Sequence, residues 1–305
     1  MQSRFRSDRR LTLRMGVTLF LLGLLYVAFV AALIVLLKSW VLVVVIAAGL
    51  LVAQYWFSDR IALYAMHGRI VEREEYPQLH GVVDRLCAVA DMPKPVVAVS
   101  GIDMPNAFAT GRNADNAVIC VTTGLLRRLE PAELEGVLAH ELSHVAHKDV
   151  AVITVASFLG VIAGLMVRFA FYSQLFRGRK DQNTLAVFAA IMGVSAAVYA
   201  ISFLLIRALS RYRELAADRA AAQLTGRPSA LASALTKVDG DIARIPSRDL
   251  RTAQAFNAFY FSPATGTEPG ITRFFSTHPS LAQRLDQLGR MSAELGEAAV
   301  PGKAE

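Results

Sequence analysis

Four long apolar runs, arranged as two pairs, constrain the fold of this 305-residue chain more than any other feature of its sequence. The first pair covers residues 15–37 and 40–57, and the second covers residues 150–171 and 185–206. A helix needs about 20 apolar residues to cross the hydrocarbon core of a bilayer, so each run is of spanning length. The pattern therefore predicts a multi-pass membrane protein in contact with the lipid bilayer.

The composition agrees with a lipid environment, because hydrophobic residues make up 54% of the chain and charged residues only 19%. A soluble globule reaches this balance only if some segments are apolar on every side. The formal net charge is +7, and basic residues gather within residues 4–14 and 207–213, beside the apolar runs. No aromatic interleaving and no RNA- or DNA-binding motif accompanies them, so we expect no nucleic-acid partner.

The arginines before the first run indicate that the N-terminus lies in the cytoplasm, by the positive-inside tendency. The apolar stretch is too long for a secretory signal peptide and a second span follows it directly, so we expect it to be retained. Two crossings then return the chain to the cytoplasm before Ser58. The link at residues 172–184 carries Arg177, Arg179 and Lys180, which fits poorly with an outer-side location.

Between and after the apolar pairs the sequence indicates a folded aqueous domain. Apolar spacing predicts a helix over residues 76–90, and Glu130-Pro131 opens a second helix, since proline is favoured in a first turn. Further helices are predicted at residues 207–222, 229–238 and 279–290, with an irregular stretch at 240–270. Short β-rich segments at residues 95–100, 106–110 and 117–121 predict a small antiparallel sheet. The predicted fold class is mainly α with this sheet, an α+β domain.

The helix that starts at Pro131 carries the run His140-Glu141-Leu142-Ser143-His144. Residues four apart lie on one face of a helix, so the two imidazoles can bind a single ion. Glu141 projects beside them, where it can act as general base toward a water that zinc has made more acidic. The motif therefore predicts a hydrolytic zinc site. His147 lies two turns from His140, too far for all three histidines to bind one ion from a single helix.

A catalytic zinc ion needs a third protein ligand, and Glu214 is the best candidate. Asp218 follows one turn later on the same helical face, where it can accept the outer N–H of a ligand histidine. We therefore expect one Zn²⁺ per chain. If His140, His144 and Glu214 share that ion, the apolar pair between them crosses the membrane twice or not at all, and a hairpin lying partly in the membrane fits the basic link.

Four motifs together resemble the HtpX-type membrane zinc endopeptidases, a gluzincin group related to the prenyl-CaaX protease. They are His140 to His144, Arg211 to Asp218, Asn106 to Gly111, and Thr277 to Ser280. The resemblance implies that Glu214 is the third ligand and Glu141 the catalytic base. It also implies a site facing the cytoplasm at a bacterial inner membrane, and quality control of damaged or misassembled membrane proteins.

The resulting domain organisation has five parts. Residues 1–57 form the basic segment and first transmembrane hairpin, and residues 150–206 form the second apolar hairpin, inserted in the protease domain. That domain comprises residues 58–149 with the zinc-binding helix and residues 207–292 with the third ligand, in a gluzincin-like arrangement. Residues 293–305, rich in Ala, Gly and Glu, are expected to be disordered.

Polypeptide substrates of such a protease bind as an added strand at a sheet edge. We nominate the strand Asn106 to Thr110 for this role, with Asn106, Ala107 and Phe108 as substrate-binding residues. His278 is our candidate for stabilising the oxyanion of the tetrahedral intermediate, and Arg284 is the alternative and a further substrate-binding candidate.

Two other functions remain open from the residues alone. A transporter or zinc-sensing receptor could use the same ligands, although spans without acidic residues argue against an ion pathway. A prenyl-protein protease with narrow substrate choice would share the chemistry and differ in specificity.

Overall fold

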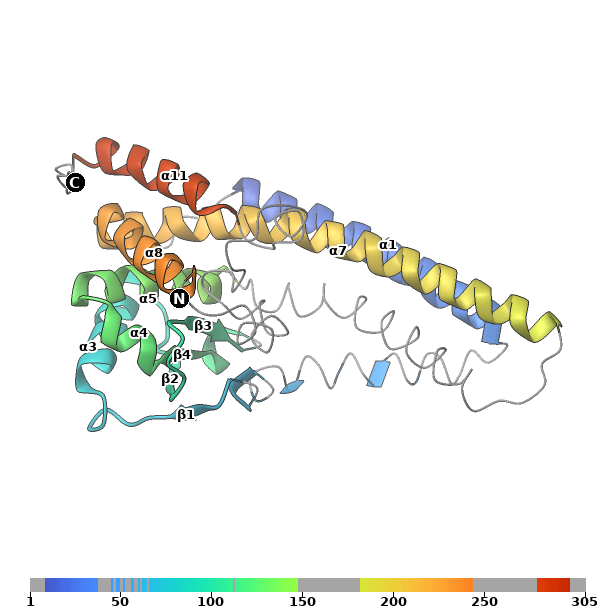
Figure 1. Ribbon diagram of the computed structural model, residues 1–305, viewed down its shortest axis with the longest axis horizontal. Coiled ribbons are helices and arrows are strands. Elements are labelled where there is room, and N and C mark those ends of the chain that lie inside the picture. Colours follow the sequence, from blue (N-terminus) through green and yellow to red (C-terminus); the bar gives the residue numbers. More distant parts are fainter. Residues whose placement is uncertain are drawn as a thin grey trace. The chain divides into compact units, whose positions relative to one another are not determined.

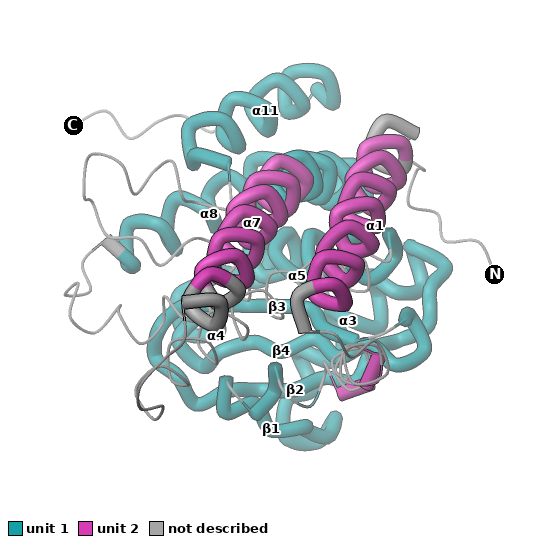
Figure 2. The backbone as a smooth tube through the Cα atoms, turned by 90° about the vertical axis from the view of Figure 1, so that its right-hand side faces the viewer, with its two compact units in different colours: residues 1–11, 58–150, 210–305 teal, residues 12–57, 151–209 magenta. Residues whose placement is uncertain are grey.

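The computed structural model describes residues 9–37, 66–111, 113–147, 182–243 and 279–296, with scattered positions between 45 and 64. It divides into two compact units, coloured separately in Figure 2. Unit 1 comprises residues 1–11, 58–150 and 210–305, and unit 2 comprises residues 12–57 and 151–209. The expected spans at 40–57 and 150–171, His278 and most of the predicted tail lie largely or wholly outside the described residues.

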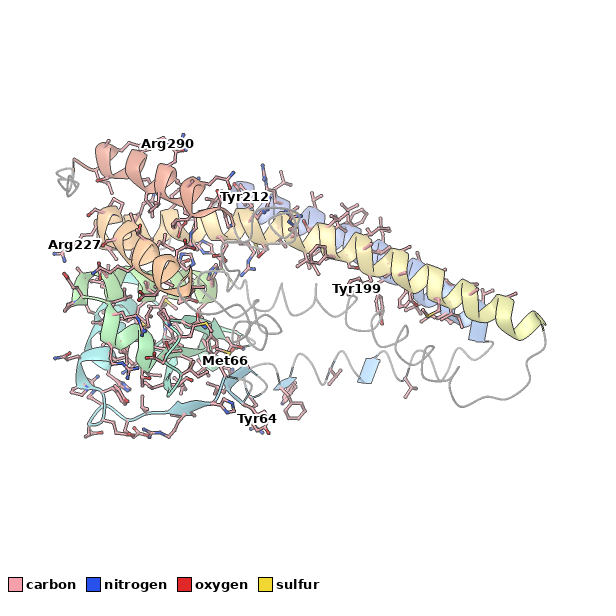
Figure 3. All side chains as sticks on the ribbon, in the orientation of Figure 1. Tyr64, Met66, Tyr199, Tyr212, Arg227 and Arg290 are labelled. Atoms are coloured by element: carbon pink, nitrogen blue, oxygen red, sulfur yellow. The ribbon has the colours of Figure 1, made fainter. Side chains whose placement is uncertain are left out.

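In unit 2, α1 (Arg9–Leu37) and the first part of α7 (Gln182–Thr225) run side by side (Figures 1 and 2). Leu22, Phe29 and Leu33 pack with Val198 in a small apolar core. Large apolar side chains remain exposed around this core, including Leu13, Phe20, Val27, Val35 and Tyr199 (Tyr199 is labelled in Figure 3). Segments Leu13–Val35 and Ala189–Thr225 are long and apolar enough to cross a membrane.

Unit 1 contains a four-stranded sheet in the order β1-β2-β4-β3. Its strands are β1 (Gly68–Ile70), β2 (Val96–Ser100), β3 (Ala107–Thr110) and β4 (Val118–Thr122). The prediction of an antiparallel sheet was wrong, because β2 and β4 pair in parallel and only β1-β2 and β3-β4 are antiparallel. All five residues of β4 are buried, so this apolar strand takes a central position and leaves β3 at the edge.

Helices of unit 1 pack on this sheet and on one another (Figure 1). The predicted helices are observed as α3 (Pro77–Ala90), α5 (Pro131–Ala146), α8 (Pro228–Ala243) and α11 (Leu281–Glu294). Two short elements were not predicted, the 3₁₀ turn η1 (Ala114–Asn116) and α4 (Thr123–Arg128). The segment predicted as a separate helix from Arg207 continues the apolar helix α7 without a break, since no glycine or proline interrupts residues 194–225.

The start of α5 is attached to α8 through a buried carboxylate. Glu133 accepts hydrogen bonds from the N–H of Glu130 at 2.8 Å, from Ser233 at 2.6 Å and from Lys237 at 2.8 Å. Burial opposes ionisation of Glu133, but these donors outweigh it and lower its pKa. A Cβ at Gly136, one turn along α5, would lie 3.3 Å from Leu231 of α8. The helix that carries the two histidines is therefore held closely against α8.

Gly124 allows α4 to approach the loop that leads into β3. A Cβ there would lie 1.8 Å from the carbonyl oxygen of Asp103, a backbone atom that cannot rotate away. We expect Gly124→Ala to lower the free energy of unfolding by about 1–3 kcal/mol, measured by denaturant unfolding in detergent. Gly81→Ala is the control, because a Cβ at Gly81 in α3 meets nothing within 4 Å. Alanine within a helix is favoured over glycine by about 0.5–1 kcal/mol, so this variant should be slightly more stable than the parent. Equal stability of the two variants would contradict this explanation of Gly124.

Candidate metal centre

Helix α5 places His140, Glu141 and His144 together in the interior of unit 1. Their exposed fractions are 1%, 5% and 7%. Another face of α5 is apolar, with Leu138 and Leu142 completely buried in the main core. Because core packing fixes the rotation of the helix, the two imidazoles point to the same side.

Glu214 comes from α7, 70 residues after His144, and completes a group of three possible metal ligands. The Nε2 atoms of the two histidines are 3.3 Å apart; that of His140 lies 3.5 Å from Oε2 of Glu214, and that of His144 lies 3.5 Å from Oε1, so one donor atom from each residue lies within 4.8 Å of the others. Ligand atoms about 2.0–2.2 Å from a tetrahedral zinc ion lie about 3.3–3.6 Å from one another. The spacing of these donors therefore fits zinc.

Asp218 fixes the orientation of His140 from the next turn of α7. The Nδ1–H of His140 donates to Asp218 Oδ1 at 2.9 Å, which leaves the Nε2 lone pair directed at the other donors. Burial lowers the pKa of His140, but the carboxylates of Asp218 and Glu214 outweigh burial and raise it to about 9. An environment that favours a proton on this imidazole also favours a metal cation beside it.

Arg284 approaches the same centre from α11. Its Nε and Nη2 donate to the two oxygens of Asp218 at 2.7 and 2.6 Å, and its Nη1 lies 4.0 Å from Glu214 Oε2. Burial raises the pKa of Asp218, but the guanidinium and His140 outweigh that effect and lower it. The structure thus brings Arg284 to the group of possible metal ligands, whereas the sequence analysis had offered it only as an oxyanion or substrate-binding candidate.

Glu141 lies between His140 and His144 in sequence, and its carboxylate faces β3. Its Oε2 accepts a hydrogen bond from the main-chain N–H of Ala109 at 3.0 Å. Burial raises the pKa of Glu141; His140 and His144 oppose this shift, and the charge of Glu214 adds to it. A buried carboxylate with a raised pKa has the properties expected of a proton acceptor in catalysis.

The three nominated substrate residues lie at the start of the edge strand β3. Asn106 accepts a main-chain hydrogen bond from Thr122 at 2.9 Å, so its main-chain groups point toward β4. Main-chain groups alternate in direction along a strand, so those of Ala107 and Ala109 point away from β4, on the side of Glu141. The side chains of Asn106, Ala107 and Phe108 are buried, at 0%, 1% and 4% exposure.

One further residue at the centre was not predicted. Arg213, directly before Glu214, is 7% exposed, and its Nη2 lies 3.5 Å from Nδ1 of His144. Its place beside a predicted ligand was the only signal in the sequence. His147, which we did not expect to bind the ion, ends α5 with its Nδ1 2.7 Å from the carbonyl of Ser143.

Comparison with known proteins gives a consistent result. A model of Peptidase family M48 matches residues 73–292. The chain is 86% identical over 304 residues to "Protease HtpX homolog 1" of Streptomyces coelicolor, with 100% of both chains covered. It is 49% identical over 298 residues to "Protease HtpX homolog" of Moorella thermoacetica, covering 97% of this chain and 99% of that one.

Among solved structures, the crystal structure of S. mikatae Ste24p matches with a TM-score of 0.50 and 18% identity, covering 92% of this chain and 67% of that chain. At this identity the match concerns the fold alone. The resemblance to HtpX-type proteases seen in the sequence is confirmed by the close relatives. With a matching family model over most of its length and a buried His-His-Glu group suited to a metal, the chain belongs to peptidase family M48 and is a metalloprotease.

Proposed function

We propose that the chain is a zinc endopeptidase that binds one Zn²⁺ through His140, His144 and Glu214. The observation that carries this proposal is the spacing of the three donor groups, 3.3 and 3.5 Å, at side chains that are all buried. Zinc would lower the pKa of a water molecule to about 7 and polarise the scissile carbonyl. Asp218 would hold His140 in the tautomer that presents Nε2 to the ion.

Glu141 acts as the general base in this proposal. Its carboxylate lies within the ligand helix, next to the histidines, and the N–H of Ala109 restricts its position. After accepting a proton from the attacking water, it can deliver that proton to the leaving amine. The raised pKa of Glu141 makes its carboxylate a stronger base toward the water, and the protonated carboxyl group is still much more acidic than the ammonium group that forms on the leaving amine.

The substrate is an extended polypeptide that runs along the edge of β3. Ala107 directs its main-chain groups to the side on which Glu141 lies, so a peptide paired with this strand would pass the catalytic carboxylate. Main-chain pairing is insensitive to side-chain identity, which suits unfolded substrates of varied sequence. His278 stays our candidate for stabilising the oxyanion.

The substrates are membrane-associated or misfolded proteins, and the process is membrane protein quality control at a bacterial inner membrane, with the site facing the cytoplasm. Support comes from the exposed apolar side chains of α1 and α7 and from the basic residues within 4–14, ahead of the first apolar run. A protease anchored in this way acts close to the lipid surface.

Removal of the metal tests the proposal directly. Full-length protein in detergent should lose casein cleavage when treated with a zinc chelator, and should regain it when about one equivalent of zinc per chain is restored. Calcium added in place of zinc is the control, because an imidazole-containing tetrahedral site does not suit it. Cleavage that persists after complete zinc removal would refute the proposal, and zinc binding without any cleavage would favour a transporter or sensor.

A further inference from the structure

The carboxylate of Asp218 is held from two sides in the interior of unit 1. On one side it accepts from His140 at 2.9 Å. On the other side Arg284 donates to both of its oxygens, at 2.7 and 2.6 Å. A bidentate pair fixes the plane of a carboxylate as well as its position. The direction of the hydrogen bond to His140 therefore depends on the guanidinium.

Arg284 makes this contact from an element that is remote in sequence from both ligand helices. It is 2% exposed, and α11 is docked by the apolar side chains of Leu288 and Met291 and by Gln287, whose amide donates to the carbonyl of Leu215 at 2.6 Å. Leu215 directly follows Glu214. Helix α11 thus contacts α7 beside the third ligand and, one turn later, beside Asp218.

We infer that Arg284 is a positioning residue of the metal centre, which acts through Asp218 on His140 and makes metal affinity depend on the docked C-terminal helix α11. This inference rests on the proposed zinc site. Nε and Nη2 of Arg284 both donate to Asp218, Nη2 also lies 3.5 Å from Nδ1 of His140, and Nη1 faces Glu214. The side chain is therefore directed at two of the proposed ligands and at the carboxylate that orients one of them. Arg284 follows Asp218 by 66 residues, so the centre is complete only when α11 has docked on α7.

Zinc affinity of full-length variants in detergent tests this inference, with chelator competition and the visible spectrum of the cobalt-substituted protein as readouts. Arg284→Lys keeps the charge but loses the bidentate geometry, and we expect zinc affinity to fall by about 10–100-fold. Asp218→Asn should have a similar effect. The double variant should bind zinc no more weakly than Asp218→Asn alone, because Arg284 acts through Asp218.

Peptide cleavage distinguishes positioning from contact with the substrate. For Arg284→Lys, raising zinc to saturation should recover most of the lost kcat, and KM for the peptide should be unchanged. Arg290→Lys is the matched control, since Arg290 lies on the outer side of α11 (Figure 3), 70% exposed and paired with Asp286. Its zinc affinity and cobalt spectrum should equal those of the parent protein.

A milder variant covers the case in which Arg284→Lys does not fold. Gln287→Ala removes only the hydrogen bond from α11 to Leu215, and we expect a smaller loss of zinc affinity in the same direction. Parental affinity and cobalt spectrum in either folded variant, or additive losses in the double variant, would overturn the inference. If the parent protein itself binds no zinc, the proposed function fails instead, so the two failures are distinguishable.

Discussion

Glu141→Gln protein is expected to bind zinc with parental affinity and to cleave unfolded polypeptide about 10²–10⁴-fold more slowly. Glutamine has nearly the same shape, so it preserves the packing of this 5% exposed side chain and can still accept the hydrogen bond from Ala109. It cannot accept the proton of the attacking water. The measurement is kcat/KM on casein, together with zinc content of the purified variant.

Glu135→Gln is the control for this substitution. Glu135 lies on the same helix, six residues earlier, and pairs with Arg85 at 3.0 Å with 17% of its side chain exposed. We expect its kcat/KM to stay within about twofold of the parent, as for a single partly exposed ion pair. Cleavage by Glu141→Gln at the parental rate would show that another group takes the proton.

Glu214→Ala is expected to lose both zinc binding and cleavage, unlike Glu141→Gln, which should lose cleavage alone. Removal of an outer residue that orients a ligand costs about 10–100-fold in affinity, so loss of a ligand itself should cost more than about 100-fold. The remaining donors, His140 and His144, lie on one helix and leave half of a tetrahedral site unfilled. Chelator competition measures the affinity, and casein cleavage at a fixed low zinc concentration measures the activity.

The control for Glu214→Ala is Gln223→Ala, an exposed position on the same helix, where both zinc affinity and cleavage should be unchanged. Together the four variants assign separate roles to the metal and to the base. A Glu214→Ala protein that retains zinc with parental affinity would remove Glu214 from the ligand set and require another third donor.

Local sequence patterns predicted most elements of the aqueous part within a few residues. The prediction of a helix from Pro131 was correct because proline, the capping pair Glu130 and Glu133, and an apolar face all favour the same start. The prediction for β3 was also close. The prediction of the strand pairing was wrong. The order of the strands depends on which of them is stabilised most by burial at the centre of the sheet, and a local sequence pattern does not compare one strand with another.

The candidate site likewise combines residues that the sequence predicted with contacts that it did not predict. Spacing on one helix was sufficient to place His140 and His144 together, and Glu214 and Asp218 were suggested by their own spacing of four. The spacing of residues along the sequence does not predict that Arg284 donates hydrogen bonds to Asp218, 66 residues earlier. Nor does it predict that the N–H of Ala109 donates to Glu141. Such contacts arise from the packing of separate elements.

By itself, the sequence predicted the apolar helices that the structure describes as α1 and the first part of α7, the helix that carries His140 and His144, and the candidate donor groups, because each follows from the periodicity of a single segment. Only the tertiary structure decided the parallel pairing of β2 with β4, the edge position of β3 beside Glu141, and the attachment of α11 to the candidate metal centre. These features depend on side chains far apart in the chain meeting in a closely packed interior, where burial and hydrogen-bond geometry select one arrangement.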